Sequence, residues 1–267
     1  MYQPTRTFCF FGETGPKIHL FGRATGSWRH YCFEDRPHPE ANIELYNRFA
    51  RMAEVTRVSE IFLPDPRCFN TVICNQTDLI KRVQGNCNEV VLRRGCMADG
   101  VVINPGQAAA IASGDCPTIV AYASGAKVAV VAHAGLGSLV DMDLWAGAPA
   151  RTHFSVVDAV VDAAKHHGVK PGFLEVRIVC GIGPGRYERK DLAENIRARW
   201  PACVDGQTIN MAKLIALQFE SHGVLSVASD QVDTYGDRGV DGGLLWHSQR
   251  RDRNESGRNL VLVVNPR

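Results

Sequence analysis

The segment from Asp115 to His133 constrains the fold of this chain more than any other. It reads DCPTIVAYASGAKVAVVAH, in which two alternating runs rich in β-branched residues flank the pair Ser124-Gly125. Glycine tolerates the positive φ of tight turns, so the segment predicts an antiparallel hairpin with a two-residue turn. Paired residues in such a hairpin have numbers that sum to 249, and Cys116 and His133 satisfy that sum. The hairpin therefore predicts that these two residues are cross-strand partners.

Directly opposed residues project to one face of a sheet, with Cβ atoms about 4.5–5.5 Å apart. At that separation a thiolate and an imidazole can share one metal ion or one proton. A purely structural interpretation also stays open, with Cys116 as a small buried hydrophobe and His133 as a core histidine. Pro117 cannot donate a ladder hydrogen bond and can push Cys116 into a bulge. A one-residue slip would turn the two side chains to opposite faces.

The remaining pattern predicts strands first and then a mixture of strands and helices. Further strands are expected at VVL, GVVIN, AAAIAS, FLEVRIVCG, VLSVAS and NLVLVV. Helices are expected through Ile43, Tyr46, Phe49 and Ala53, from an N-cap at Thr152 to Gly168, over 188–199, and from Ile209 to Gly223. This order predicts an α+β fold with mixed sheets, and the absence of repeats and low-complexity segments favours a single domain over residues 1–267.

Composition and charge exclude several classes of protein. Hydrophobic residues make up 45% of the 267 residues, which is typical of a globular chain. A formal charge of +2 argues against a nucleic acid partner and favours a small-molecule substrate. Nine scattered cysteines without a CxxC pair exclude a disulfide framework and a zinc ribbon. With neither a secretory signal nor a long apolar run, we expect a cytoplasmic protein with no membrane contact.

Two glycine-containing loops follow predicted strands. AHAGLGSL spans 132–139 and includes His133, and CGIGPGRYE spans 180–188. Each pattern is a weak signal by itself, because most such loops are only turns. We expect both near strand ends, where pockets commonly form.

Four segments together resemble a known family. They are SGDCPTIV, VVAHAGLGSL with its histidine 17 residues after the cysteine, GIGPGRYE, and HSQRRDRNESGR near the C-terminus. This chain resembles the YfiH-like, or laccase-domain, family of purine-nucleoside-processing enzymes, also called multicopper polyphenol oxidoreductases or peptidoglycan editing factors. In addition, FGRATGS resembles the family's early arginine-glycine segment, with Arg23 at the arginine. The resemblance implies mixed β-sheets packed as a sandwich flanked by helices, a fold shared with the cytotoxic necrotizing factor deamidases.

The resemblance also implies a zinc ion bound by Cys116, His133 and a third ligand. The stretch CNQTDLIKRVQGN places either Gln84 or Asp78 where the family has its first histidine. Glutamine is a poor zinc ligand, whereas a carboxylate from Asp78 is a credible one. The tryptophan and arginine of the family's HAGWRG motif are replaced by Leu136 and Gly137, which removes a positive charge. The sequence therefore predicts a diverged member with an altered metal site.

What the family likeness implies for activity is phosphorolysis of a purine nucleoside, with hydrolysis or deamination as related reactions. Phosphate would be the co-substrate, held by Arg23 or Arg251. His247, Arg250 and Asp252, in the same C-terminal motif as Arg251, offer further polar or anion-binding character.

Two rival functions stay open. The first is a metal-free thiol hydrolase or deamidase with Cys116 as nucleophile and His133 as base. The second is a catalytically inactive ligand-binding paralogue. Copper oxidase activity has the least support, because only His166 and His167 are neighbours among the nine histidines, and copper sites need close groups of them.

Overall fold

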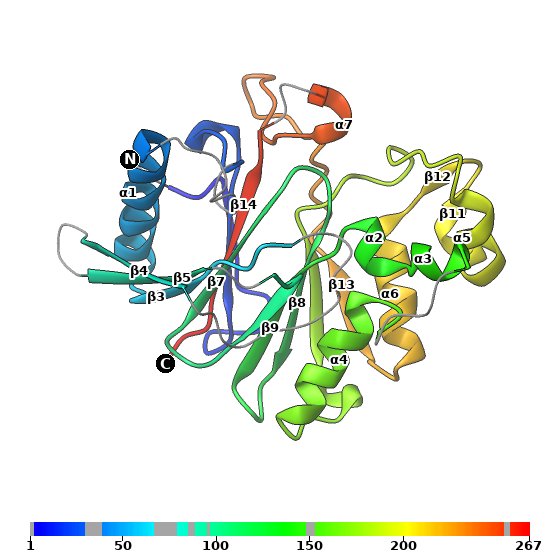
Figure 1. Ribbon diagram of the computed structural model, residues 1–267, viewed down its shortest axis with the longest axis horizontal. Coiled ribbons are helices and arrows are strands. Elements are labelled where there is room, and N and C mark those ends of the chain that lie inside the picture. The colour runs from blue at the N-terminus through cyan, green and yellow to red at the C-terminus, as the bar shows by residue number, and fades with distance from the viewer. Residues whose placement is uncertain are drawn as a thin grey trace.

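Two β-sheets packed face to face form the centre of the protein in this computed structural model, which describes residues 3–29, 39–66, 79–84, 89–94, 97–147, 153–253 and 257–267 (Figure 1). The first sheet has seven strands in the order β1-β2-β14-β7-β3-β5-β4. Their bounds are β1 Arg6–Phe8, β2 Lys17–Phe21, β3 Glu60–Phe62, β4 Leu79–Gln84, β5 Glu89–Arg94, β7 Ala108–Ser113 and β14 Asn259–Val264.

The second sheet has five strands in the order β13-β10-β8-β9-β6. Their bounds are β6 Gly100–Ile103, β8 Thr118–Ala123, β9 Val128–His133, β10 Glu175–Val179 and β13 Ser226–Ser229. A separate two-stranded ribbon joins β11 Val204–Asp205 to β12 Thr208–Ile209. Both large sheets contain parallel and antiparallel pairs, as predicted for mixed sheets.

Side-chain alternation along the strands builds three apolar layers. In β8, Val120 and Tyr122 point into the core between the two sheets, while Ile119 and Ala121 point to the outer face. The core between the sheets also contains Val261 of β14, so both sheets contribute to it. Period-two alternation of this kind buries both faces of a sheet when each face has a covering layer.

Helices cover the outer faces of the sandwich. On the seven-stranded sheet, α1 (Pro39–Thr56) packs through residues such as Phe49 and Met52 (Figure 1). On the five-stranded sheet lie α2 (Leu136–Leu139), α4 (Val156–His166) and α6 (Met211–Ser221). The remaining short helices are α3 Met142–Trp145, α5 Ala193–Arg199 and α7 Gln249–Asp252. The α+β class and the sandwich flanked by helices are therefore confirmed.

The predicted hairpin exists, but its predicted register was wrong. Thr118, not Cys116, pairs with His133, because the turn contains the four residues 124–127 instead of two. The left-handed conformation in this turn belongs to Lys127, with φ 54°, and not to Gly125. Pro117 leaves Cys116 just before the start of β8. The observed register differs from the predicted one by two residues, so Cys116 lies two positions before Thr118, the actual partner of His133.

Element ends account for the other differences. Helix α4 begins after Ser155, whose side chain forms a capping box with Asp158; the predicted cap at Thr152 lies outside the described residues. Helix α5 covers only the second half of 188–199, and α6 begins after the N-cap Asn210, with Ile209 in β12. The sequence patterns did not predict β1, β2, β3, β4, β11 and β12, all of which are six residues long or shorter.

None of the helices in the described ranges combines the length and the apolar character required to cross a lipid bilayer.

Candidate functional site

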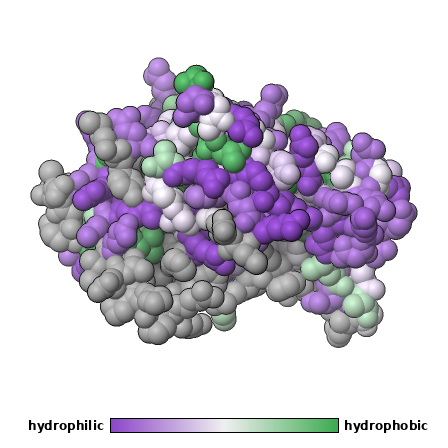
Figure 2. Space-filling view, turned by 90° about the horizontal axis from the view of Figure 1, so that it is seen from above, coloured by the Kyte–Doolittle hydropathy of each residue, from purple (hydrophilic) through white to green (hydrophobic). Residues whose placement is uncertain are grey.

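A cavity of about 470 Å³ opens at one end of the sandwich, where strands of both sheets end. The segments that line it include those that follow β3 and β7, the last residue of β9 and the residue just before β14. The lining residues are Arg29, Asp65, Pro66, Ala112, Ser113, Gly114, Asp115, Cys116, His133, Tyr187, Gln249, Arg250 and Arg258. Figure 2 looks onto this end of the molecule, where the described surface is mainly hydrophilic.

Cys116 and His133 both line this cavity, although they are not cross-strand partners. His133 is buried, with its backbone N–H donating to Asp99 O at 2.7 Å. Burial and the positive charge of Arg258 lower the pKa of His133 to about 4. Its imidazole is therefore neutral at pH 7 and able to accept a proton. Cys116 is half-buried, and its carbonyl accepts a hydrogen bond from Ser113 Oγ at 2.8 Å.

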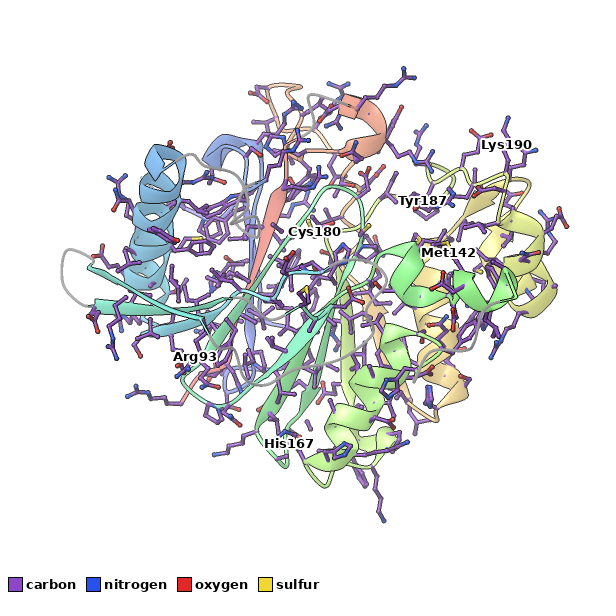
Figure 3. The ribbon with its side chains drawn as sticks, in the orientation of Figure 1. Arg93, Met142, His167, Cys180, Tyr187 and Lys190 are labelled. Carbon is purple, nitrogen blue, oxygen red and sulfur yellow. The ribbon has the colours of Figure 1, made fainter. Side chains whose placement is uncertain are left out.

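Tyr187 closes another side of the cavity. It lies between β10 and α5 in the chain, on the segment labelled at the upper right of Figure 3. Burial and the charge of the nearby Cys116 raise the pKa of the Tyr187 hydroxyl, against the opposing effect of Arg189 and Arg250. The guanidinium of Arg250 stacks over the Tyr187 ring, 4.6 Å from its centroid. Thiol, phenol and guanidinium thus face one space.

Asp115 joins three segments around the cavity. This buried carboxylate accepts hydrogen bonds from Thr234 Oγ1 at 2.8 Å and from the backbone N–H of Arg250 at 2.7 Å. Its carbonyl accepts from Ile182 N at 2.9 Å. Charge-assisted bonds to a buried carboxylate are among the stronger hydrogen bonds in proteins. Asp115 therefore fixes the start of α7 and the loop after β10 relative to Cys116.

Of the arginines that the sequence suggested, only Arg250 lines the cavity. Arg29, Arg250 and Arg258 line it, whereas Arg23 and Arg251 do not. Arg251 binds Asp252 through two hydrogen bonds, of 2.7 Å and 3.0 Å, and donates to three backbone carbonyls. Arg23 lies 3.4 Å from the same carboxylate of Asp252.

His247 also lies outside the cavity lining. Its ring packs so closely on Gly257 that a Cβ at that glycine would lie 2.5 Å from the ring. Burial and Arg23 lower the pKa of His247 to about 4, against the opposing charge of Asp252. Asp252 is instead the shared partner of two arginines, so this part of the C-terminal motif stabilises the local structure.

The two glycine loops have different roles. After His133, the second half of AHAGLGSL forms the short helix α2, in which Leu136 and Gly137 are buried and neither lines the cavity. The N–H groups of Ser138 and Leu139 both donate to Gly135 O, at 2.9 Å and 3.1 Å. They are therefore not directed at a ligand. CGIGPGRYE, in contrast, reaches the cavity through Tyr187.

Several cavity residues were not singled out from the sequence. Tyr187 and Arg258 lie inside motifs that had been recognised, and Asp115 directly precedes Cys116, so these three had a sequence signal. Arg29 and Asp65 belong to the first 70 residues, where no motif marks them. Only the folded chain brings them to the cavity.

The described residues do not complete a zinc site. Within the described ranges, no group of three or more His, Cys, Asp or Glu side chains lies close enough together to hold a metal ion. Cys116 and His133 supply two donors, and the positive charge of Arg258 acts on His133. A site with only these two donors does not fit the coordination that zinc requires.

Of the two predicted third ligands, one can be placed. The backbone of Gln84 pairs with Glu89, which lines a different cavity, whereas the Leu79 end of β4 pairs with Arg94. Gln84 thus stands at the end of β4 away from the cavity with Cys116. Asp78 lies outside the described residues.

A four-layer α+β sandwich with a thiol and an imidazole at the strand ends defines the class of protein. The chain belongs to the family described as multi-copper polyphenol oxidoreductase laccase, whose model matches residues 63–265. This confirms the YfiH-like resemblance. No curated protein matches the chain.

Solved structures share the fold at low sequence identity. YlmD from Geobacillus stearothermophilus has a TM-score of 0.67 and 18% identity, with 95% of this chain and 93% of that one covered. YfiH from Bacillus licheniformis has a TM-score of 0.62 and 15% identity, covering 93% and 92%. A Neisseria meningitidis protein has a TM-score of 0.62 and 16% identity, covering 99% and 96%.

Proposed function

We propose that the protein is an enzyme that cleaves a purine nucleoside, or a related nucleoside-like molecule, at the centre formed by Cys116 and His133. The observation that carries this proposal is the cavity of about 470 Å³ in which a neutral imidazole, a thiol and three arginines meet. Ligand pockets of roughly 300–1,000 Å³ are typical for small molecules of this size. Membership of the family supports the same assignment.

Arg29, Arg250 and Arg258 are proposed to hold the phosphate co-substrate. They carry three positive charges against the two carboxylates of the lining, Asp65 and Asp115. Both carboxylate oxygens of Asp115 already accept hydrogen bonds from protein groups. Guanidinium groups bind phosphate oxygens in a fixed planar geometry. This assignment replaces Arg23 and Arg251 as the proposed phosphate ligands.

His133 and Tyr187 are proposed to act on the nucleoside. In phosphorolysis, a phosphate oxygen bonds to C1′ of the ribose as the bond to the purine breaks, and the phosphate proton ends on the purine. The imidazole of His133 is neutral at pH 7, because burial lowers its pKa to about 4, and it is proposed to relay that proton from phosphate to the purine as the bond to C1′ forms. The Tyr187 ring, stacked with Arg250, offers a flat surface for the purine.

The test is release of free base from inosine and adenosine, compared in phosphate and in phosphate-free buffer. We expect Cys116→Ala and His133→Gln to abolish release. Arg250→Ala should raise the KM for phosphate about tenfold or more, since a charged hydrogen bond is worth roughly 1.5–3 kcal/mol. Arg82→Ala, a change of an exposed arginine on β4, is the matched control and should leave both the release of free base and the KM for phosphate unchanged. Phosphate-independent activity, or an unchanged phosphate KM in Arg250→Ala, would contradict the assignment.

A zinc ion in this enzyme would require a third donor, and Asp78 is the proposed one. Elemental analysis of the purified protein tests this: about one zinc per chain would make His133 a metal ligand and not the proton acceptor proposed above. Asp78→Ala should lose that metal, while Gln84→Ala should retain it. A wild-type protein without zinc, or loss of zinc in Gln84→Ala alone, would rule out this assignment.

A second candidate is metal-free thiol catalysis. It is favoured by the presence of the neutral His133 imidazole in the same cavity as the Cys116 thiol. The Cys116 sulfur would attack the carbonyl carbon of an amide as its proton passes to His133. The C–N bond then breaks, the amine leaves with that proton, and water hydrolyses the resulting thioester. Iodoacetamide should then alkylate Cys116 many times faster than free cysteine. Mass spectrometry of the protein with substrate should detect the acyl intermediate as an increase in mass. A Cys116 that reacts no faster than free cysteine would exclude this candidate.

A further inference from the structure

The five-stranded sheet has an open edge at β13, on the side of the strand away from β10. In the parallel pairing of the two strands, Val227 stands opposite Val176 and Ser229 opposite Ile178, and the N–H of Asp230 donates to Ile178 O at 3.1 Å. Because the direction of backbone groups alternates along a strand, the N–H and C=O groups of Val227 and Ser229 face outward.

These outward backbone groups have no hydrogen-bond partner within the described part of the chain. Val227 is half-buried and Ser229 is exposed, so the edge can be reached from solvent. Two residues with outward N–H and C=O groups supply up to four hydrogen-bonding positions. An edge of this kind is the surface to which an extended chain adds as another strand.

The open edge forms one wall of a second cavity, of about 610 Å³, which we call the β13 groove. Its lining includes Val227 and Ser229 on one wall and Ala212, Lys213 and Ala216 of α6 on another, and it is distinct from the cavity with His133. Figure 1 shows α6 beside β13. Ala212 and Ala216 are one helical turn apart on one helix face, and their small side chains leave space next to the strand.

The charge of the β13 groove favours an acidic occupant. Its ionisable lining consists of Arg186 and Lys213 against a single carboxylate, Asp233. Asp233 is engaged within its own loop, where one carboxylate oxygen accepts from Gly183 N at 2.7 Å and from Tyr235 N at 2.9 Å.

Both cations of the groove are exposed, and among the described residues neither forms an ion pair with a carboxylate. The positive charge is therefore available to a ligand in solution.

We propose that the β13 groove binds an acidic peptide segment in extended conformation, which adds to β13 as a sixth strand. The peptide backbone would bond to Val227 and Ser229, its small apolar side chains would face Ala212 and Ala216, and its carboxylates would meet Lys213 and Arg186. This interaction is independent of the chemistry proposed at Cys116.

The first measurement is fluorescence polarisation of the full-length protein with the labelled hexapeptide Glu-Val-Glu-Val-Glu-Val. The control peptides are Lys-Val-Lys-Val-Lys-Val and the acidic peptide N-methylated at alternate residues. We expect the acidic peptide to bind more weakly as salt rises, and both control peptides to bind at least about tenfold more weakly, because one loses the charge and the other the backbone donors.

Matched variants test the two components of the groove separately. Ser229→Pro removes the outward N–H and should weaken binding about tenfold, while Ser229→Ala keeps that N–H and should bind as the wild type does. Lys213→Glu should weaken binding more than Lys213→Gln. If Ser229→Pro does not fold, the N-methylated peptide tests the same backbone bonds on the wild-type protein.

Amide hydrogen exchange locates the peptide. Bound acidic peptide should slow exchange at the N–H groups of Val227 and Ser229, which strand addition would protect. The proposal is overturned if the acidic peptide does not bind at millimolar concentration, or if both control peptides bind equally well. Protection at Arg250 in place of β13 would also overturn it, as would self-association of the protein that Ser229→Pro abolishes, because β13 would then pair with a second copy.

Discussion

Arg251→Ala tests whether this arginine stabilises the fold or binds a ligand. Its guanidinium donates to the carbonyls of Thr234, Tyr235 and Trp246 at 3.1, 2.6 and 2.7 Å, and it pairs with Asp252. The side chain is only 17% exposed. Arg251 therefore holds the segment before α7 to α7 itself, and its removal leaves three carbonyls without their donor.

The magnitude follows from these contacts. Hydrogen bonds from a charged donor contribute about 1.5–3 kcal/mol each, and water can replace some of those lost at the partly open side. We expect the free energy of unfolding to fall by about 3–4 kcal/mol, which for a chain of this size lowers Tm by roughly 10 °C. Arg250→Ala is the matched neighbour: it loses one bond to Glu188 O and a stacking contact, and should cost below about 1 kcal/mol.

Urea unfolding monitored by circular dichroism measures both variants. We expect the midpoint to shift by roughly 1 M urea for Arg251→Ala and only slightly for Arg250→Ala. Titration with inorganic phosphate should show the opposite order, with affinity reduced in Arg250→Ala and retained in Arg251→Ala at a temperature where it is folded. An Arg251→Ala protein as stable as the wild type but without phosphate affinity would refute the structural role.

Three further predictions concern pH and local packing. The pKa of His133 is about 4 in the folded protein in place of 6.5, so its contribution to stability is present above pH 6.5 and is lost, by roughly 3 kcal/mol, as pH falls toward 4. In His133→Gln the urea midpoint of unfolding should therefore depend less on pH between 6.5 and 4. If the pH dependence of the midpoint is the same as in the wild type, His133 is not its cause. Ser155→Ala should destabilise the protein by about 1 kcal/mol, because the capping bond to α4 is lost, and Ser155→Gly by only a few tenths, because glycine is a tolerated N-cap. If Ser155→Ala is as stable as the wild type in urea, the cap does not matter. Gly183→Ala places a Cβ 2.6 Å from Asp233 Cγ and should lower Tm by several degrees, whereas Gly125→Ala, with open space around it, should not; the reverse order would contradict the packing.

Local features of the fold followed from the sequence. The run NLVLVV is the strand β14 over its whole length, and the β-branched runs on either side of Ser124 form a hairpin. The position of Gly168 after α4 and of Gly223 after α6 follows from their positive φ of 76° and 78°. Alternation, capping and turn preferences act within a few residues, so these features need no knowledge of distant contacts.

The hairpin register shows the limit of local inference. Whether the turn contains two residues or four depends on which residue adopts the left-handed conformation, and that residue is Lys127 although glycine is the usual choice. The correct register moves Cys116 out of the strand, yet both it and His133 still reach one cavity.

The sequence by itself determined the class of fold, the hairpin and the family motifs, because hairpin formation and motif spacing are short-range properties of the chain. Only the tertiary structure decided which arginines reach the cavity and which are bound elsewhere. Arg250 and Arg251 are adjacent in sequence, yet one faces the cavity and the other is held by Asp252 and three carbonyls. Arg29 and Arg258 are far apart in the sequence, and they line one cavity because β2 and β14 are neighbours in the seven-stranded sheet.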